Sequence, residues 1–337
     1  MRLRQQDFRV NESAWQVNTS NAEHNRFLNL AGVQQDLAQC DSFQHLIICG
    51  LPKCGSSLLL NLLDNHNQLS VFPDELRFMD AGCQNMRNVD ALVKLLQSYH
   101  IRQPLSCLAS LDDFPEHRGS RSWLREDVRF NFELFSDAIV SYFGKANTAE
   151  QRYFACFLAL AWARQQQQVL MTNKPVLVSN SLNNELYMFS WQRMLQSRVR
   201  FLWCIRNPFE QYLSLLKTAA KYGQKPLPVA LFCQWLKGRY DLLPSHAENV
   251  FILRYEDLIN NSLNTANKIA NFLNIEFQST MLQPSQNGVA CTGRSSRGID
   301  RNGIYHNPEL AKLQLDSNTL TVLDTELDVI LRRFNYR

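Results

Sequence analysis

Short apolar runs rich in β-branched residues alternate along the chain with longer segments of helical periodicity. Such runs predict buried strands, and their alternation with helices is typical of a mainly parallel sheet covered by helices. Five runs fit this description: "HLIIC" (45–49), "LSVF" (69–72), "PVLVS" (175–179), "VRFLWCI" (199–205) and "VFILRY" (250–255). The pattern therefore predicts an α/β fold of three layers, α/β/α, with a mainly parallel central sheet.

Helical periodicity fills much of the chain between the predicted strands. It favours helices over 55–66, 184–196, 208–222, 262–273 and near 318–333. The stretch 81–150 differs, because "QPLSCLASLDDFPEHRGSRSW" is typical of a loop ahead of a helical segment. We interpret 1–337 as a single domain, with 1–44 as an N-terminal extension and 81–150 as an insertion that forms a lid or one wall of a binding site.

Polar or turn-forming residues follow each predicted strand. They are Gly-Leu-Pro, Pro-Asp, Asn-Ser, Arg-Asn-Pro and Glu-Asp, in chain order. Because ligands of open α/β sheets bind outside the carboxyl ends of the strands, these segments are expected to converge on one crevice.

The composition of 45% hydrophobic and 20% charged residues is that of a soluble globular protein. A net charge of +4 is too small to indicate a surface that coats a polyanion, so no nucleic acid polymer is expected as a partner. The start, "MRLRQQDFRVNESAWQ", has no continuous apolar stretch, which argues against a secretory signal or a transmembrane segment. Nine cysteines without a C-x-x-C pair favour reduced thiols and a cytoplasmic location.

The stretch "GLPKCGSS" (50–57) joins a predicted strand to a predicted helix. A glycine-containing turn at this place presents backbone N–H groups and the positive end of a helix to an anion. Nucleotide triphosphatases place a lysine directly after the second glycine and hold magnesium with the next hydroxyl and a strand-end acid. Here Ser56 stands in the lysine position and Lys53 lies inside the loop. The sequence thus predicts a P-loop-like anion site that lacks the metal-binding half of that machinery.

A second candidate element, "IRNPFEQYLSLLK", follows the strand predicted over 199–205. Arg206 precedes a helix that has Pro208 near its start, and Ser214 lies eight residues after the arginine. Both side chains could bind the same phosphate. Taken alone, a structural ion pair is the simpler interpretation of Arg206.

Together, the two elements resemble the sulfotransferases that use 3′-phosphoadenosine 5′-phosphosulfate (PAPS). "PKCGSS" is similar to the loop that holds the 5′-phosphosulfate in that family, and "RNP" with Ser214 is similar to its 3′-phosphate motif. The resemblance implies that Arg206 and Ser214 clamp the 3′-phosphate, which distinguishes PAPS from ATP. It implies that the phosphosulfate is bound by Pro52, Lys53, Cys54, Gly55, Ser56 and Ser57.

The resemblance extends from about 45 to 305. "RYEDLINNSLNTANKIANFLNIEF" (254–277) is similar to a later segment of the family, and "GRSSRGIDRNGIY" (293–305) resembles the stretch that closes over the nucleotide in bacterial and carbohydrate-type members. The second segment implies further contacts from Arg294, Ser296 and Arg297. The lysine- and glycine-rich signature of the small-phenol enzymes is not reproduced.

Sulfuryl transfer needs an acceptor oxygen in line, a base for its proton and positive charge on the leaving phosphate, but no metal. Lys53, a compact and movable cation, is the candidate for stabilising the leaving group. Adenosine 3′,5′-bisphosphate would then be the product.

Glu75 in "VFPDELRFM" is the candidate base. With Arg77 and Phe78 it resembles a glutamate motif of glycan- and tyrosine-modifying relatives, which implies a hydroxyl or amine on a carbohydrate or glycoconjugate as acceptor. The alternative is a solvated carboxylate beside Asp74 as a helix cap. Histidine serves as base in another branch, so three histidines also stay open, the first of them more simply interpreted as a helix-end residue: His66, His100 and His117.

Two rival functions remain open at this point. One is a magnesium-dependent nucleotide kinase, and the other is a module that binds PAPS without turnover. Glu256 and Asp257 are interpreted as structural, with Asp257 as a helix cap.

Overall fold

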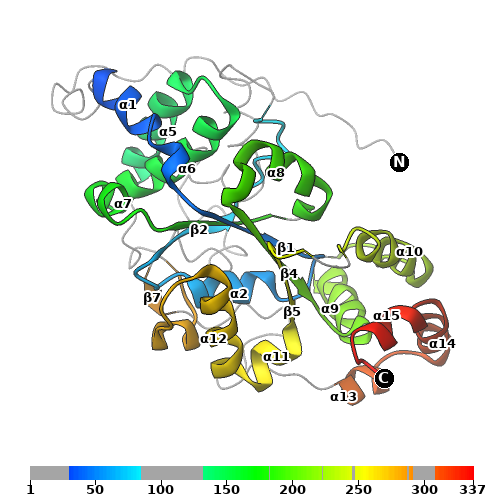
Figure 1. Cartoon of the computed structure of the whole chain (residues 1–337). Coiled ribbons are helices and arrows are strands. Elements are labelled where there is room, and N and C mark those ends of the chain that lie inside the picture. The colour runs from blue at the N-terminus through cyan, green and yellow to red at the C-terminus, as the bar shows by residue number, and fades with distance from the viewer. Residues whose placement is uncertain are drawn as a thin grey trace, which may run out of the picture.

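Five parallel strands form the central sheet in the order β2-β3-β1-β4-β5 (Figure 1). The computed structural model describes residues 30–84, 132–181, 183–221, 223–244, 247–286, 288–290 and 308–337. The strands are β1 (His45–Cys49), β2 (Leu69–Glu75), β3 (Val176–Asn180), β4 (Val199–Ile205) and β5 (Val250–Arg254). A short antiparallel pair is formed by β6 (Ser285–Gln286) and β7 (Val289–Ala290). The predicted mainly parallel sheet is confirmed.

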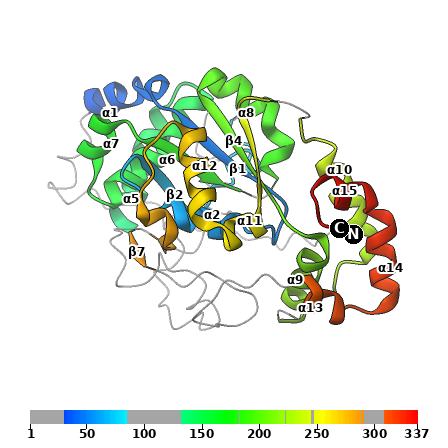
Figure 2. The same cartoon turned by 60° about the horizontal axis from the view of Figure 1, so that its bottom comes forward.

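Helices cover both faces of the sheet, so the predicted three-layer architecture is also confirmed (Figures 1 and 2). One layer contains α1 (Leu30–Leu37), α5 (Phe132–Lys145), α6 (Ala149–Ala163), α7 (Gln167–Asn173) and α8 (Met188–Leu195). The opposite layer contains α2 (Ser56–Leu63), α11 (Tyr255–Asn260) and α12 (Ser262–Leu273). Within the described ranges, every helix is too short or too polar to span a lipid bilayer.

A further group of helices gathers on the side of the sheet where β4 and β5 lie (Figure 1). It comprises α9 (Pro208–Lys221), α10 (Val229–Tyr240), α13 (Pro308–Leu313), α14 (Ser317–Glu326) and α15 (Asp328–Arg333). Short 3₁₀ turns complete the described elements: η3 (Cys40–Ser42), η7 (Asn184–Tyr187), η8 (Gln196–Arg198) and η9 (Ser279–Leu282).

Alternate residues of β1, the central strand, pack into two separate hydrophobic cores, one on each face of the sheet. Ile47 and Cys49 contact the layer that contains α6, whereas Leu46 and Ile48 contact the layer of α2 and α12. A strand buried on both faces has no polar alternation, which is why the continuous apolar run predicts β1 correctly to the residue.

The second strand is longer than its apolar run predicts. β2 continues to Glu75 through a shift of register between Val71 and Glu75, across Pro73. Proline lacks a backbone N–H, but β2 is an edge strand, where proline is tolerated. Asp74 therefore lies inside a strand, and the alternative that makes it a helix cap is wrong.

The helical end of the segment 81–150 belongs to the core. Phe135 and Ile139 of α5 are buried, and the Tyr142 hydroxyl donates to Asp36 of α1 at 2.6 Å. Residues 85–131, which carry most of the expected lid or wall, lie outside the described residues. The pattern missed α6 because "AEQRYFACFLALAWA" is buried on nearly all sides and so shows little helical periodicity.

His45 begins β1 at the end of the strand away from the predicted crevice. It is buried, and neither ring nitrogen has a hydrogen-bond partner among the residues that the structure describes. Its ring packs against Tyr153, with centroids 5.6 Å apart. Burial, assisted by the nearby Arg198 cation, lowers the pKa of His45 to about 3.

This depressed pKa predicts a loss of stability in acid. Between pH 6.5, the ordinary value, and about 3, the unfolded chain binds a proton that the folded chain does not. The free energy of unfolding should therefore decrease as the pH falls through this window. His45→Phe keeps an aromatic ring beside Tyr153 and should weaken the decrease, as measured by urea unfolding across the window. An equally steep decrease in the variant would contradict the assignment.

Candidate functional site

The loop between β1 and α2 has a backbone that requires glycine at two positions. Gly50 and Gly55 have φ angles of +145° and +101°. A Cβ on Gly50 would lie 2.6 Å from Sγ of Cys54, and one on Gly55 would lie 2.3 Å from Cδ2 of Tyr255. The glycines are therefore needed both for conformation and for close packing.

Lys53 and the start of α2 face outward from this loop. Lys53 has a φ of +70°, an unusual conformation for a residue with a side chain, and its side chain is half-buried. α2 begins at Ser56, and its N-cap, Gly55, makes no side-chain capping bond. Left-handed residues and an uncapped helix start together turn backbone N–H groups toward an anion. Ser57 is exposed and Ser56 is half-buried beside these groups.

Cys54 lies beneath the loop and is only 1% exposed. Its side chain packs against Cys204 of β4. Hydrogen bonds from the Cys204 thiol and from Ser56 lower the pKa of the Cys54 thiol, although burial opposes them. The Cys54 N–H donates to the Leu51 carbonyl at 3.1 Å, and the contact of Cys54 with a ligand stays a prediction.

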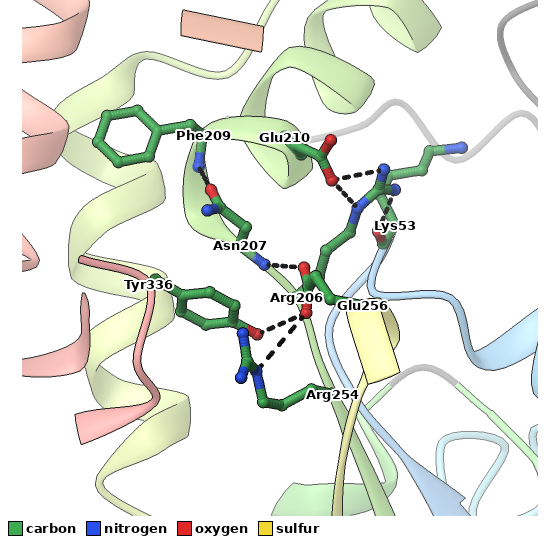
Figure 3. Close-up of polar contacts among 8 residues, drawn as sticks. All are labelled: Lys53, Arg206, Asn207, Phe209, Glu210, Arg254, Glu256 and Tyr336. Carbon is green, nitrogen blue, oxygen red and sulfur yellow. Dashed lines mark hydrogen bonds and ion pairs between the residues drawn. The ribbon is translucent and has the colours of Figure 1, made fainter. Parts of the chain in front are cut away.

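Arg206 reaches from the end of β4 to the loop that follows the neighbouring β1 (Figure 3). Its Nη1 donates to the carbonyl of Lys53 at 3.2 Å. Its Nε and Nη2 donate to Oε2 of the fully buried Glu210 at 3.3 and 3.2 Å. The guanidinium carbon also lies 4.2 Å from the ring centre of Tyr255. The structural ion pair considered for this arginine thus exists, and it holds the guanidinium beside the loop.

A residue in the first turns of α9 makes a second hydrogen bond to the loop. Gln211 donates from Nε2 to the carbonyl of Pro52 at 2.9 Å. Ser214 is buried three residues further along, and positions 207, 211 and 214 share one side of a helix. The structure thus brings Pro52, Lys53 and Arg206 together, and Ser214 lies one helical turn beyond Gln211 on the same side of α9. Glu210 and Gln211 were missed in the sequence analysis, although their spacing from Arg206 and Asn207 is a helical signal.

Asn207 and Glu256 fix the start of α9. The side-chain oxygen of Asn207 accepts from the Phe209 N–H at 3.0 Å, and the Asn207 N–H donates to Oε1 of Glu256 at 2.7 Å. Glu256 is therefore structural, as predicted. Asp257 is not a helix cap, because it lies inside the first turn of α11, and Asn261 is the N-cap of α12.

On the other side of the loop, η7 holds the end of β1. The Glu185 carboxylate accepts from the Gly50 N–H at 3.4 Å and pairs with Nη1 of Arg239 in α10 at 3.2 Å. Asn184 donates from Nδ2 to the carbonyl of Ile48 at 2.9 Å. Burial raises the pKa of Glu185, while Arg239 and the Gly50 N–H oppose the rise. No sequence pattern indicates a role for Glu185, because its contacts join segments far apart in the chain.

Glu75 is the last residue of β2 and pairs in register with Asn180 of β3, which pairs in turn with Ile48 of β1. Two inter-strand spacings, about 10 Å, therefore separate the backbone of Glu75 from that of β1. The side chain is half-buried. Phe78 is buried against Tyr153 and so belongs to the core.

The histidine alternatives are placed in part. His66 is buried after the end of α2, with Nδ1 accepting from the Gln68 N–H at 3.1 Å and Nε2 at 2.8 Å from the Glu276 carbonyl. Burial lowers the pKa of His66, and both ring nitrogens are used, so its role is structural. Five other residues of interest lie outside the described residues: His100, His117, Arg294, Ser296 and Arg297. That the site works without a metal stays a prediction.

Comparisons with known proteins identify relatives of this chain. A family model described as "Sulfotransferase family" matches residues 45–279, which is more than half of the chain. No curated protein matches significantly. Among solved structures, the sulfotransferase domain of an olefin synthase from Synechococcus PCC 7002 is 17% identical, with a TM-score of 0.49 over 80% of this chain and 92% of that one. A sulfotransferase from Mycobacterium avium is 13% identical, with a TM-score of 0.44 over 91% and 82%. Scores this low indicate nothing about ligands.

The close approach of Tyr255 to Gly55 predicts that one added methyl group at position 55 weakens anion binding. Gly55→Ala should displace the Tyr255 ring or the loop and reduce anion binding about tenfold or more, because both φ and space exclude a side chain. Calorimetric titration with adenosine 3′,5′-bisphosphate measures the effect. Gly223→Ala is the matched control, because Gly223 also has a positive φ but nothing lies within 4 Å of its added Cβ. Equal affinities for the two variants would contradict the packing argument.

Proposed function

Because the chain belongs to the sulfotransferase family, we propose that it transfers a sulfuryl group from PAPS to an acceptor hydroxyl, or amine, and releases adenosine 3′,5′-bisphosphate. One observation carries the proposal: Arg206 is hydrogen bonded to the Lys53 carbonyl at 3.2 Å. That bond joins the two anion-binding motifs across the adjacent strands β1 and β4.

The residues present fit a nucleotide with separate phosphate groups. The loop supplies N–H groups from the start of α2 together with the Lys53 ammonium, which suits the 5′-phosphosulfate. Within the part of the chain that the structure describes, the hydrogen bonds of Arg206 use three of the five N–H groups of its guanidinium, and two remain for a phosphate oxygen. Ser214 lies on the side of α9 that faces the loop and adds a hydroxyl for the 3′-phosphate. Ser56 in place of the P-loop lysine disfavours a kinase.

When bound, the donor supplies a sulfuryl group attached to a phosphate that can leave. Lys53 is proposed to neutralise the charge that develops on this phosphate. Glu75 is proposed to take the proton of the acceptor. The backbone of Glu75 lies two strand spacings, about 10 Å, from the end of β1, and the acceptor is proposed to bind across this distance.

The acceptor is proposed to be a carbohydrate or glycoconjugate. The support is the resemblance of Glu75, Leu76, Arg77 and Phe78 to glycan-modifying relatives. Of these, Glu75 and Arg77 keep exposed surface, and Arg77 lies 3.6 Å from the carboxylate of Asp80. We also propose a reducing compartment such as the cytoplasm, because the described cysteines are buried free thiols.

Nucleotide selectivity tests the proposed donor. Without magnesium, adenosine 3′,5′-bisphosphate should bind more tightly than ADP or ATP in calorimetric titration. Arg206→Ala should lower the affinity for the bisphosphate by about tenfold to a hundredfold, because a charge-assisted hydrogen bond to phosphate is lost. Arg200→Ala is the control on the same strand, since Arg200 donates to the Leu273 carbonyl. Magnesium-dependent preference for ATP would instead support a kinase.

Two substitutions test the proposed chemistry. Lys53→Ala and Glu75→Gln should each lower the rate of sulfuryl transfer by about a hundredfold or more, while Glu75→Gln keeps the parental nucleotide affinity. Single-turnover assays with labelled PAPS and a panel of glycan acceptors provide the measurement, with Lys268→Ala as a control on the exposed side of α12. Parental rates in both variants would refute the assignment. Tight binding without transfer to any acceptor by the parent would support a silent PAPS-binding module.

A further inference from the structure

A chain of buried polar contacts connects the start of α9 to the segment that follows α15 (Figure 3). Its centre is the Glu256 carboxylate, which is 3% exposed. One oxygen accepts from the Asn207 N–H at 2.7 Å, and the other accepts from the Tyr336 hydroxyl at 3.1 Å. Arg254 adds a weaker contact, with its Nε 3.9 Å from Oε2. One hydrogen bond thus joins Tyr336 to Glu256, and a second joins Glu256 to the backbone next to Arg206.

Tyr336 is itself held firmly. Its N–H donates to the Leu331 carbonyl at 2.8 Å, and the guanidinium of Arg254 lies 4.8 Å from the centre of its ring. Arg254 also donates to the Asn335 carbonyl at 3.4 Å. Burial, with the charge of Glu256, raises the pKa of the Tyr336 hydroxyl well above its ordinary value. The hydroxyl therefore stays protonated and remains a donor to the carboxylate.

The peptide at Asn207 decides where Arg206 points. Pro208 follows with a fixed φ and no N–H, and the Asn207 side chain is committed to the Phe209 N–H. The Asn207 residue is 3% exposed, so without Glu256 its N–H would be a buried donor that has lost its hydrogen-bond partner, which is costly. Glu256 is consequently the contact that sets the direction in which the chain leaves β4 at Arg206.

We propose that Tyr336 is a positioning residue for the anion site: by holding Glu256 against Asn207, it fixes Arg206 in the orientation that meets both the Lys53 carbonyl and a bound phosphate. The identity of that phosphate, the 3′-phosphate of PAPS, rests on the proposed function. The positioning itself rests on the contacts alone.

Tyr336→Phe removes the hydroxyl and keeps the partly buried ring, so the variant should fold. The matched control is Tyr212→Phe, because Tyr212 lies on α9 and its hydroxyl donates to the Leu227 carbonyl at 2.8 Å, away from Asn207. If the Tyr336 hydroxyl were merely structural, loss of a tyrosine hydroxyl would lower the free energy of unfolding in both variants and leave the ligand affinity of both unchanged. A positioning hydroxyl alters affinity in the first variant alone.

The first measurement is calorimetric titration with adenosine 3′,5′-bisphosphate and with AMP. Tyr336→Phe should bind the bisphosphate about five- to tenfold more weakly than the parent and bind AMP about equally, whereas Tyr212→Phe should match the parent with both. In a Glu256→Gln background the effect of Tyr336→Phe should shrink, because the path runs through that carboxylate. Parental selectivity in Tyr336→Phe, or the same loss in both tyrosine variants, would overturn the proposal.

The second measurement needs no nucleotide. Hydrogen exchange should show a less protected Asn207 amide in Tyr336→Phe than in the parent or in Tyr212→Phe. If the parent binds neither nucleotide, the proposed function fails, and the exchange rates still decide the positioning. Unchanged exchange at Asn207 in Tyr336→Phe would refute the positioning role even if nucleotide binding succeeds.

Discussion

The hydrogen bond from Arg206 to the Lys53 carbonyl is the contact on which the arrangement of this site depends. It forms only because β4 lies directly beside β1, so that the residues following the two strands meet. A cation that is 7% exposed needs a compensating charge, and Glu210, one helical turn away and fully buried, supplies it. The planar guanidinium can serve a carboxylate, a carbonyl and a ring face at once, whereas a lysine at this position could not.

The loop is held from both sides, and this explains how it keeps an unusual backbone. Arg206 and Gln211 bind successive carbonyls on the β4 side, while Glu185 accepts from the Gly50 N–H on the β3 side. A left-handed residue with a side chain, such as Lys53, persists only where surrounding contacts determine its conformation. A site built in this way needs little rearrangement when an anion binds, which is the condition for effective electrostatic stabilisation.

Sequence patterns predict those features that are local or repeat along one element. β1 and β4 are predicted to the residue because β1 is a continuous buried run and β4 is one apart from Arg200. The loop and the R-N-P element are recognised because the spacing of glycine, lysine and arginine carries their chemistry. The pattern does not predict α6, because this helix is buried on nearly all sides. β2 extends beyond the predicted apolar run because an edge strand tolerates Pro73. The roles of Glu185 and Tyr336 are not predicted for another reason. Only tertiary folding brings these residues to their hydrogen-bond partners, and residue spacing within one segment cannot show such a contact.

The order of the strands also separates two tasks within the proposed function. The anion contacts lie on the β4 side of β1, where α9, α11 and the segment after α15 support them, whereas Glu75 lies beyond β3 on the other side. The contacts that orient Arg206 do not include Glu75 or its neighbours among the described residues. If the proposed function holds, substitutions around β2 should therefore change the choice of acceptor and leave the contacts of Arg206 intact. A change at Asn207 or Glu256 should instead act first on binding of the proposed donor, because those residues hold the backbone that carries Arg206.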